Sequence, residues 1–125
     1  MILGTGFDLV AVRRFARFVE RRGERALERL FTPEELDYCL SHRDPAPFLA
    51  ARFAAKEAFY KALGTGMGAA GGWRDVEVVR LSSGRPLLML HGRAASLVHD
   101  LQVRTIHLSL SHTADTAGAF VVFEA

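Results

Sequence analysis

An acid and a base, Glu57 and Lys61, stand four residues apart in an alanine-rich segment that leads into the glycine-rich run 64–72. If the segment is helical, this spacing places both side chains on one face, with the acid on the N-terminal side. A carboxylate and an ammonium group in that arrangement could serve one diphosphate. We therefore expect phosphate and metal chemistry at this helix.

Asp8 is a second candidate carboxylate, because it follows small and apolar residues of a predicted strand. Such a carboxylate must be exposed, paired or metal-bound, since burying it alone is costly. Two carboxylates from different elements, with phosphate oxygens and waters, make a typical Mg²⁺ site. The residues leave an alternative open, in which Asp8 caps the next element and Glu57 pairs with Lys61 on a solvated face.

The glycine-rich run has two interpretations: its backbone N–H groups bind an anion, or it ends the helix and forms a loop. It contains no GxxxxGK[ST] pattern and it follows a helix, which argues against a P-loop and against a dinucleotide-binding fold. His112 lies at a predicted strand end without a second histidine at metal-ligand spacing, and no G-x-S-x-G is present. The sequence thus argues against a zinc enzyme and a serine hydrolase.

Seven arginines and only three glutamates lie between Arg13 and Arg29. This basic stretch could bind a nucleic-acid backbone or an acidic protein, or its glutamates could neutralise it within the helix. Few aromatic residues lie near the arginines, and no nucleic-acid-binding signature is present. We therefore favour an acidic protein over nucleic acid as the partner.

Hydrophobic periodicity and turn residues predict an α+β fold in one domain covering residues 1–125, with no linker and no low-complexity segment. The predicted strands cover residues 2–12, ending near Asp8 or just beyond it, 76–81, 86–90, 105–111 and 117–124. The predicted helices cover residues 13–30, 33–42, 48–63 and 92–101. Thr32 before Pro33 is the expected cap of the second helix.

The composition narrows the class of protein further. Half of the 125 residues are hydrophobic, which is enough for a real core. Cys39 is the only cysteine, so an intrachain disulfide and a cysteine-cluster zinc site are excluded. No leader peptide is apparent, and no apolar run approaches the ~20 residues that span a bilayer. We expect a cytoplasmic protein without a membrane partner.

Six segments carry a resemblance to one family: GTGFDLV at 4–10, FTPEE at 31–35, RFAAKEAFYKA at 52–62, WRDVEV at 73–78, GRP at 84–86 and LSLSHT at 108–113. In this order they resemble the holo-[acyl-carrier-protein] synthases, the bacterial type of 4′-phosphopantetheinyl transferase. The segment at 52–62 is the most specific of the six. The resemblance covers nearly the whole chain and implies a small α+β fold in which an antiparallel-rich sheet packs with helices.

The resemblance implies transfer of the 4′-phosphopantetheine arm from coenzyme A to a serine of an apo acyl carrier protein, in support of fatty acid biosynthesis. Asp8 and Glu57 would hold Mg²⁺, and Lys61 would contact the phosphates. The proton acceptor is either Asp8 directly or Glu57 through a water on the metal. Further contacts to coenzyme A are expected from Arg52, Lys56, Gly64, Thr65, Gly66 and His112.

The same resemblance gives the basic stretch a partner, since acyl carrier proteins are small and acidic. The expected carrier-protein contacts are Arg13, Arg14, Arg17, Arg21 and Arg25. Homotrimers with coenzyme A at each subunit interface are also implied. Two alternatives compete: a non-catalytic arginine-rich module that binds an acidic protein or RNA, and a phosphohydrolase in which water replaces the serine.

Overall fold

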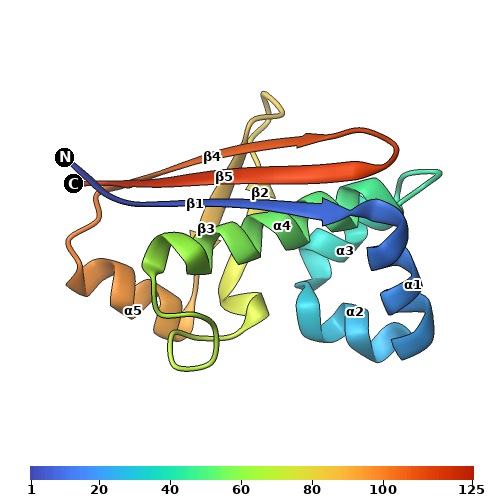
Figure 1. Cartoon of the computed structure of the whole chain (residues 1–125), viewed down its shortest axis with the longest axis horizontal. Coiled ribbons are helices and arrows are strands. Elements are labelled where there is room, and N and C mark those ends of the chain that lie inside the picture. The colour runs from blue at the N-terminus through green and yellow to red at the C-terminus, as the bar shows by residue number, and fades with distance from the viewer.

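A three-stranded antiparallel sheet packed against one long helix forms the centre of the molecule (Figure 1). The computed structural model describes all 125 residues. The sheet has the order β1 (Ile2–Ala11), β5 (Thr116–Glu124) and β4 (Thr105–His112), and the helix is α4 (Ala46–Leu63). The predicted α+β fold with an antiparallel-rich sheet is confirmed. No helix is long and apolar enough to cross a membrane.

The other elements surround this centre. β2 (Val76–Arg80) and β3 (Pro86–Leu90) form a separate antiparallel ribbon that runs across the sheet in Figure 1. The shorter helices gather toward the two ends of the sheet. They are α1 (Val12–Arg22), α2 (Glu24–Leu30) and α3 (Pro33–Leu40) at one end and α5 (Gly92–Asp100) at the other, and the 3₁₀ turn η1 (Trp73–Asp75) lies between the two groups.

Small residues bring α4 into close contact with the sheet. Ala54, Ala55 and Ala58 on the helix are completely buried. On β1, a Cβ atom at Gly4 or Gly6 would collide with a backbone carbonyl of α4. Because side chains alternate along a strand, Asp8 lies on the same face as these two glycines. The glycines thus allow Asp8 to lie directly against the helix.

One predicted helix is divided in the structure, and one predicted strand continues past Asp8, which the prediction placed at or near the strand end. The predicted helix 13–30 is broken at Gly23, whose φ of 77° belongs to the left-handed region, so the arginines are divided between α1 and α2. β1 continues to Ala11, because it stays paired with β5 up to Thr116, and Asp8 therefore lies inside the strand. The predicted cap at Thr32 is present, and its hydroxyl accepts the N–H of Glu35 at 3.2 Å.

The lone thiol belongs to the interior of the fold. Cys39 is completely buried among the apolar residues that pack α3 against α1 and α4. Burial raises the pKa of this thiol to about 11. It is therefore protonated at neutral pH and packs as a small apolar side chain.

Candidate active site

Asp8 and Lys61 form an ion pair between β1 and α4. Lys61 Nζ lies 2.7 Å from Asp8 Oδ1 and also donates to the backbone carbonyl of Phe7 at 3.2 Å. The hydrogen bond to Asp8 raises the pKa of Lys61, so the amine stays charged at neutral pH. The alternative in which Lys61 pairs with Glu57 along the helix is not observed, because the ammonium group reaches across to the strand.

Glu57 lies close enough to this pair for the charges of Asp8 and Lys61 to change its pKa. Burial raises the pKa of Glu57, the negative charge of Asp8 raises it further, and Lys61 partly offsets both. Asp8 and Glu57 line one cavity of about 390 Å³, which we call the carboxylate cavity. The structure thus brings Asp8, Glu57 and Lys61 together, as their predicted roles require.

The two carboxylates fit a Mg²⁺ ion. Asp8 and Glu57 come from different elements, and their negative charges repel each other. A divalent cation would relieve that repulsion, and Mg²⁺ keeps several waters and needs only one or two protein oxygens. No cluster of three or more metal-binding side chains exists in the chain, so the site lacks the ligands of a structural zinc centre.

Glu57 also lines a second cavity, of about 310 Å³, which we call the phosphate cavity. Its lining residues are Glu57, Tyr60, Lys61, Gly64, Gly66, Met67 and Trp73. Gly64 ends α4 in the left-handed conformation, and its N–H donates to the carbonyl of Tyr60 at 3.0 Å. That N–H is therefore not free for an anion, although the Gly64 backbone still borders the cavity. Thr65 is exposed between Gly64 and Gly66.

The placement of Lys56 contradicts the predicted contact to coenzyme A. Its side chain is completely buried, and the ammonium donates to Glu35, Trp73 and Val76. These three bonds use all three N–H groups, so none is left for a phosphate. Lys56 therefore has a structural role, and only Lys61 of the two lysines faces a cavity.

Arg52 is likewise almost completely buried, with 3% of its surface exposed. Its guanidinium lies 4.3 Å from the centre of the Tyr38 ring, and Nη1 donates to the carbonyl of Phe48 at 3.4 Å. Nε and Nη2 have no hydrogen-bond partner. A buried donor without a partner is costly, so Arg52 retains unused capacity to bind an anion. It does not line the cavities that contain Glu57 or Lys61.

His112 lies away from the three central side chains. It ends β4 and lines a cavity of about 320 Å³ on the outer face of the sheet, together with Phe7 and Leu9. Its ring also packs edge-on against Phe48, at 4.9 Å between ring centres. Within one chain, the structure therefore does not bring His112 together with Lys61.

The arginines of α1 and α2 are exposed, and none lies within 4.0 Å of a carboxylate. No ion pair therefore neutralises these arginines, which outnumber the three glutamates of the same stretch. Arg14 lines the carboxylate cavity together with Phe15, Phe18 and Phe53. Arg25 lines another cavity of about 350 Å³, which we call the arginine cavity. Its full lining is Phe18, Arg22, Arg25, Ala26, Arg29, Leu30 and Trp73.

Sequence reasoning missed the residues that connect these cavities. Trp73 borders both the phosphate cavity and the arginine cavity, and Phe18 borders both the carboxylate cavity and the arginine cavity. Phe18 is 40% exposed although it lies in an otherwise amphipathic helix. For Phe18, the sequence signal of a functional position was a large apolar residue among arginines. For Trp73 the signal was its place as the only tryptophan, directly after a glycine-rich run.

Comparison with known proteins identifies the family. The profile of the 4′-phosphopantetheinyl transferase superfamily matches residues 4–117. The chain belongs to this superfamily. The resemblance predicted from the six sequence segments is thereby confirmed.

Individual members of the superfamily match over almost their full length. The chain is 53% identical to a holo-[acyl-carrier-protein] synthase of Syntrophotalea carbinolica, covering 97% of this chain and 94% of the relative. The crystal structure of the Neisseria meningitidis holo-[acyl-carrier-protein] synthase has a TM-score of 0.92 at 36% identity, with 100% of both chains covered. The Helicobacter pylori synthase, solved in complex with coenzyme A, has a TM-score of 0.84 at 30% identity, covering 96% of this chain and 99% of that one.

Proposed function

We propose that this chain transfers the 4′-phosphopantetheine arm of coenzyme A to a serine hydroxyl of an apo acyl carrier protein. The products are the holo carrier protein and adenosine 3′,5′-bisphosphate, and we place the reaction in the cytoplasm, in support of fatty acid biosynthesis. The observation that carries the proposal is the convergence of Asp8, Glu57 and Lys61 on adjoining cavities.

In this reaction the serine oxygen bonds to the phosphorus that carries the pantetheine arm, and the bond from that phosphorus to the bridging oxygen breaks. Negative charge grows on the leaving phosphate. Lys61 stabilises this charge, because its ammonium is held by Asp8 and yet keeps 54% of its side chain exposed. The serine proton passes to one of the two carboxylates, Asp8 or Glu57.

Asp8 and Glu57 would hold Mg²⁺ against the diphosphate. When bound there, the ion neutralises charge on the phosphate oxygens and orients the diphosphate for in-line displacement. Without the ion, two carboxylates would face an anionic substrate and repel it. Burial raises the pKa of Glu57 and the negative charge of Asp8 raises it further, and this repulsion between the two carboxylates supports the assignment.

The arginine surface of α1 and α2 would dock the acidic carrier protein. The predicted contacts Arg13, Arg14, Arg17, Arg21 and Arg25 are all exposed, and Arg22 and Arg29 extend the same surface. Charged surfaces of this kind act mainly on association rate and are screened over ~8 Å at physiological salt. We expect salt to raise the KM for the carrier in the wild type, and to do so much less in Arg14→Ala/Arg21→Ala. Equal salt dependence in that variant and in the control Arg104→Ala would contradict the assignment.

Three copies would share the outer face of the sheet. Phe7, Leu9 and Phe120 are 55%, 62% and 43% exposed there, and the Phe7 and Phe120 rings lie 6.3 Å apart. An apolar patch of this kind is typical of a protein interface, and the family resemblance favours a trimer. Light scattering should give the mass of three chains for the wild type and of one for Leu9→Asp. A monomeric, active wild type would contradict the trimer.

A shared sheet face would also complete the coenzyme A site. His112 lines the cavity on this face, whereas Lys61 lines the phosphate cavity. In a trimer, His112 and Arg52 of one copy would contact the coenzyme A held by Lys61 of its neighbour. Mixing a His112→Ala chain with a Lys61→Ala chain should then restore part of the activity. No recovery after the subunits have exchanged would contradict shared sites.

The direct test of the proposed function is transfer itself. The purified protein is incubated with coenzyme A, Mg²⁺ and an apo acyl carrier protein, and the intact mass of the carrier is measured with and without a chelator. We expect a gain of one phosphopantetheine that the chelator abolishes. An unchanged carrier mass with several carriers, or hydrolysis of coenzyme A without a carrier, would overturn the proposal.

A further inference from the structure

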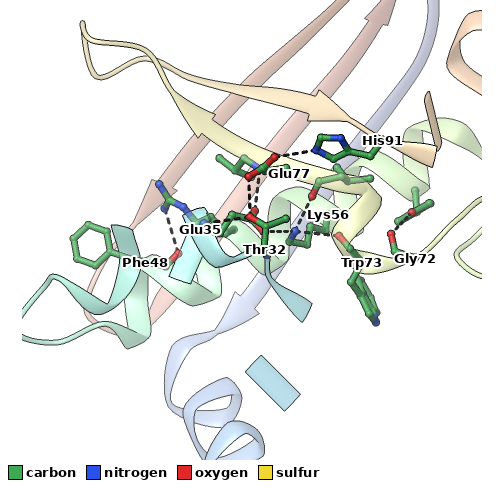
Figure 2. Close-up of polar contacts among 12 residues, drawn as sticks. Thr32, Glu35, Phe48, Lys56, Gly72, Trp73, Glu77 and His91 are labelled. Atoms are coloured by element: carbon green, nitrogen blue, oxygen red, sulfur yellow. Dashed lines mark hydrogen bonds and ion pairs between the residues drawn. The ribbon is translucent and has the colours of Figure 1, made fainter. Parts of the chain in front are cut away.

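A buried polar network outside the proposed reaction centre joins α3, α4, η1 and β2 (Figure 2). Lys56 Nζ donates to Glu35 Oε1 at 2.8 Å, to the carbonyl of Val76 at 2.6 Å and to the carbonyl of Trp73 at 3.0 Å. Glu35 also accepts the backbone N–H groups of Thr32 and Val78, each at 2.9 Å. The ammonium and both carboxylate oxygens are therefore satisfied within the protein.

Stability alone is a weak reason for this arrangement. Lys56 and Glu35 are 0% and 1% exposed, and burial lowers the pKa of Lys56 while the charge of Glu35 opposes that shift. An apolar pair of similar size is often as stable as a buried ion pair. Unlike an apolar pair, the ion pair makes directional hydrogen bonds. Each of these bonds fixes the position of the backbone group that it contacts.

The group fixed next to the candidate site is Trp73. Figure 2 shows its carbonyl turned toward Lys56 and its indole ring directed away from the network. The residue borders the phosphate cavity on one side and the arginine cavity on the other. Its ring packs against Phe53 at 5.1 Å between ring centres. Trp73 is thus a wall common to the proposed coenzyme A side and the proposed carrier side.

The residue before Trp73 is anchored as well. Tyr60 donates its hydroxyl to the carbonyl of Gly72 at 2.6 Å, and the N–H of Gly72 donates to Asp75 at 3.2 Å. Burial, assisted by the charge of Asp75, raises the pKa of Tyr60 to about 12, so the phenol remains a donor. The backbone around Trp73 is therefore held by two side chains of α4, Lys56 and Tyr60, on the helix that also carries Glu57.

We propose that Lys56 and Glu35 are positioning residues for the transfer step. They hold Trp73 as a fixed wall, against which the serine segment of the carrier protein is aligned with the diphosphate of coenzyme A. Neither residue touches a reacting atom. The inference rests on the proposed function and names the residues that set its geometry.

The test is the double variant Glu35→Gln/Lys56→Met, which removes both charges together and keeps the side chains similar in size. A small misplacement of reacting groups can cost about 100-fold in rate, so we expect kcat to fall by about that factor while KM for coenzyme A stays within about twofold. Trp73 is the only tryptophan, so the protein's tryptophan fluorescence measures the environment of this indole ring directly. Emission should move to longer wavelength, with an unchanged far-UV circular dichroism spectrum.

A folded double variant with the kcat and the emission of the wild type would overturn the inference. If the double variant does not fold, Trp73→Ala decides, because the bond from Lys56 to Trp73 goes to the backbone carbonyl and survives this change. We expect its kcat to fall, and a wild-type kcat would overturn the inference.

The matched control is His91→Gln. His91 bonds to Glu77 at the outer end of the network and shares no hydrogen bond with Lys56. It should keep the kcat of the wild type, and an equal loss in this control would overturn the specific role of Lys56. If the wild type itself modifies no carrier, the proposed function fails; if it does and the variants match it, only this inference fails.

Discussion

Two lysines of α4 form ion pairs of opposite character. Neither Lys56 nor its partner Glu35 has an exposed side chain, whereas Lys61 keeps 54% of its side chain exposed beside Asp8. Lys56 uses all three N–H groups on protein oxygens, and Lys61 donates to only two, on Asp8 and Phe7. A phosphate can therefore approach Lys61 but not Lys56.

The difference follows from helix geometry and from the neighbouring elements. A helix turns by about 100° per residue, so positions 56 and 61 point about 140° apart. One side faces α3 and β2, which supply oxygens for Lys56, and the other faces β1 and open cavities. Ion pairs with the same chemistry thus serve structure on one side and, in the proposed function, catalysis on the other.

Removing only the buried lysine should have the largest effect. Lys56→Ala leaves Glu35 charged, buried and unpaired, which costs roughly 3–5 kcal/mol of the free energy of unfolding. Urea denaturation followed by circular dichroism measures this loss. Lys61→Ala is the matched control and should cost no more than about 1 kcal/mol, because its pair is partly solvated. Equal losses in the two variants would contradict the distinction.

Removing the charge of the surface lysine should instead affect catalysis. Lys61→Met should lower kcat by about 10²–10³-fold, the range found when one donor to a developing negative charge is lost. Its free energy of unfolding should stay close to that of the wild type. The intact mass of the carrier protein, followed over time, gives the rate. A Lys61→Met enzyme with more than a tenth of the wild-type kcat would show that Lys61 is no phosphate contact.

The approach of β1 to α4 can be disturbed without changing a charge. Gly6→Ala places a methyl group against the carbonyl of Ala58, and such overpacking costs about 1–3 kcal/mol. Because the strand must move away, the Asp8–Lys61 pair should separate and activity should fall along with stability. Gly72→Ala is the control, since its Cβ meets nothing within 4 Å. A Gly6→Ala variant as stable as this control would contradict the close packing.

The smallest effect concerns Glu57 in the metal-free protein. Its pKa is higher in the folded than in the unfolded chain, so its ionisation opposes folding above the folded pKa, and this penalty disappears as the pH falls below the unfolded pKa. Metal-free Glu57→Gln should therefore be slightly more stable than the wild type at neutral pH and equally stable in acid. Urea denaturation with chelator at both pH values tests this. A less stable variant at neutral pH would contradict the raised pKa of Glu57, which burial and the charge of Asp8 produce.

The sequence predicted correctly those features that depend on residues close together in the chain or on a specific motif. The fold class, the cap at Thr32 and the central helix followed from periodicity and turn residues. The grouping of Asp8 with Glu57 and Lys61 followed from their residue types and from the family resemblance. The family and the enzyme class predicted from the six segments agree with the relatives.

Contacts between distant segments could not be predicted in this way. Lys56 is buried by Glu35, 21 residues earlier, and by Val76, 20 residues later, and no spacing rule connects them. The i,i+4 rule favoured a pair between Lys61 and Glu57, but the strand lies close enough for Asp8 to accept the bond instead. The break at Gly23 was missed because the charge pattern continues across it.

In the proposed function, Asp8 and Glu57 hold the metal on which transfer depends. The most direct measurement is a Mg²⁺ titration of phosphopantetheine transfer, read as the intact mass of the carrier protein, for the wild type, Asp8→Asn and Glu57→Gln. We expect saturable activation of the wild type and, for each folded variant, either no transfer or a demand for far more Mg²⁺. A variant that transfers at the wild-type rate at the same Mg²⁺ concentration would contradict the account.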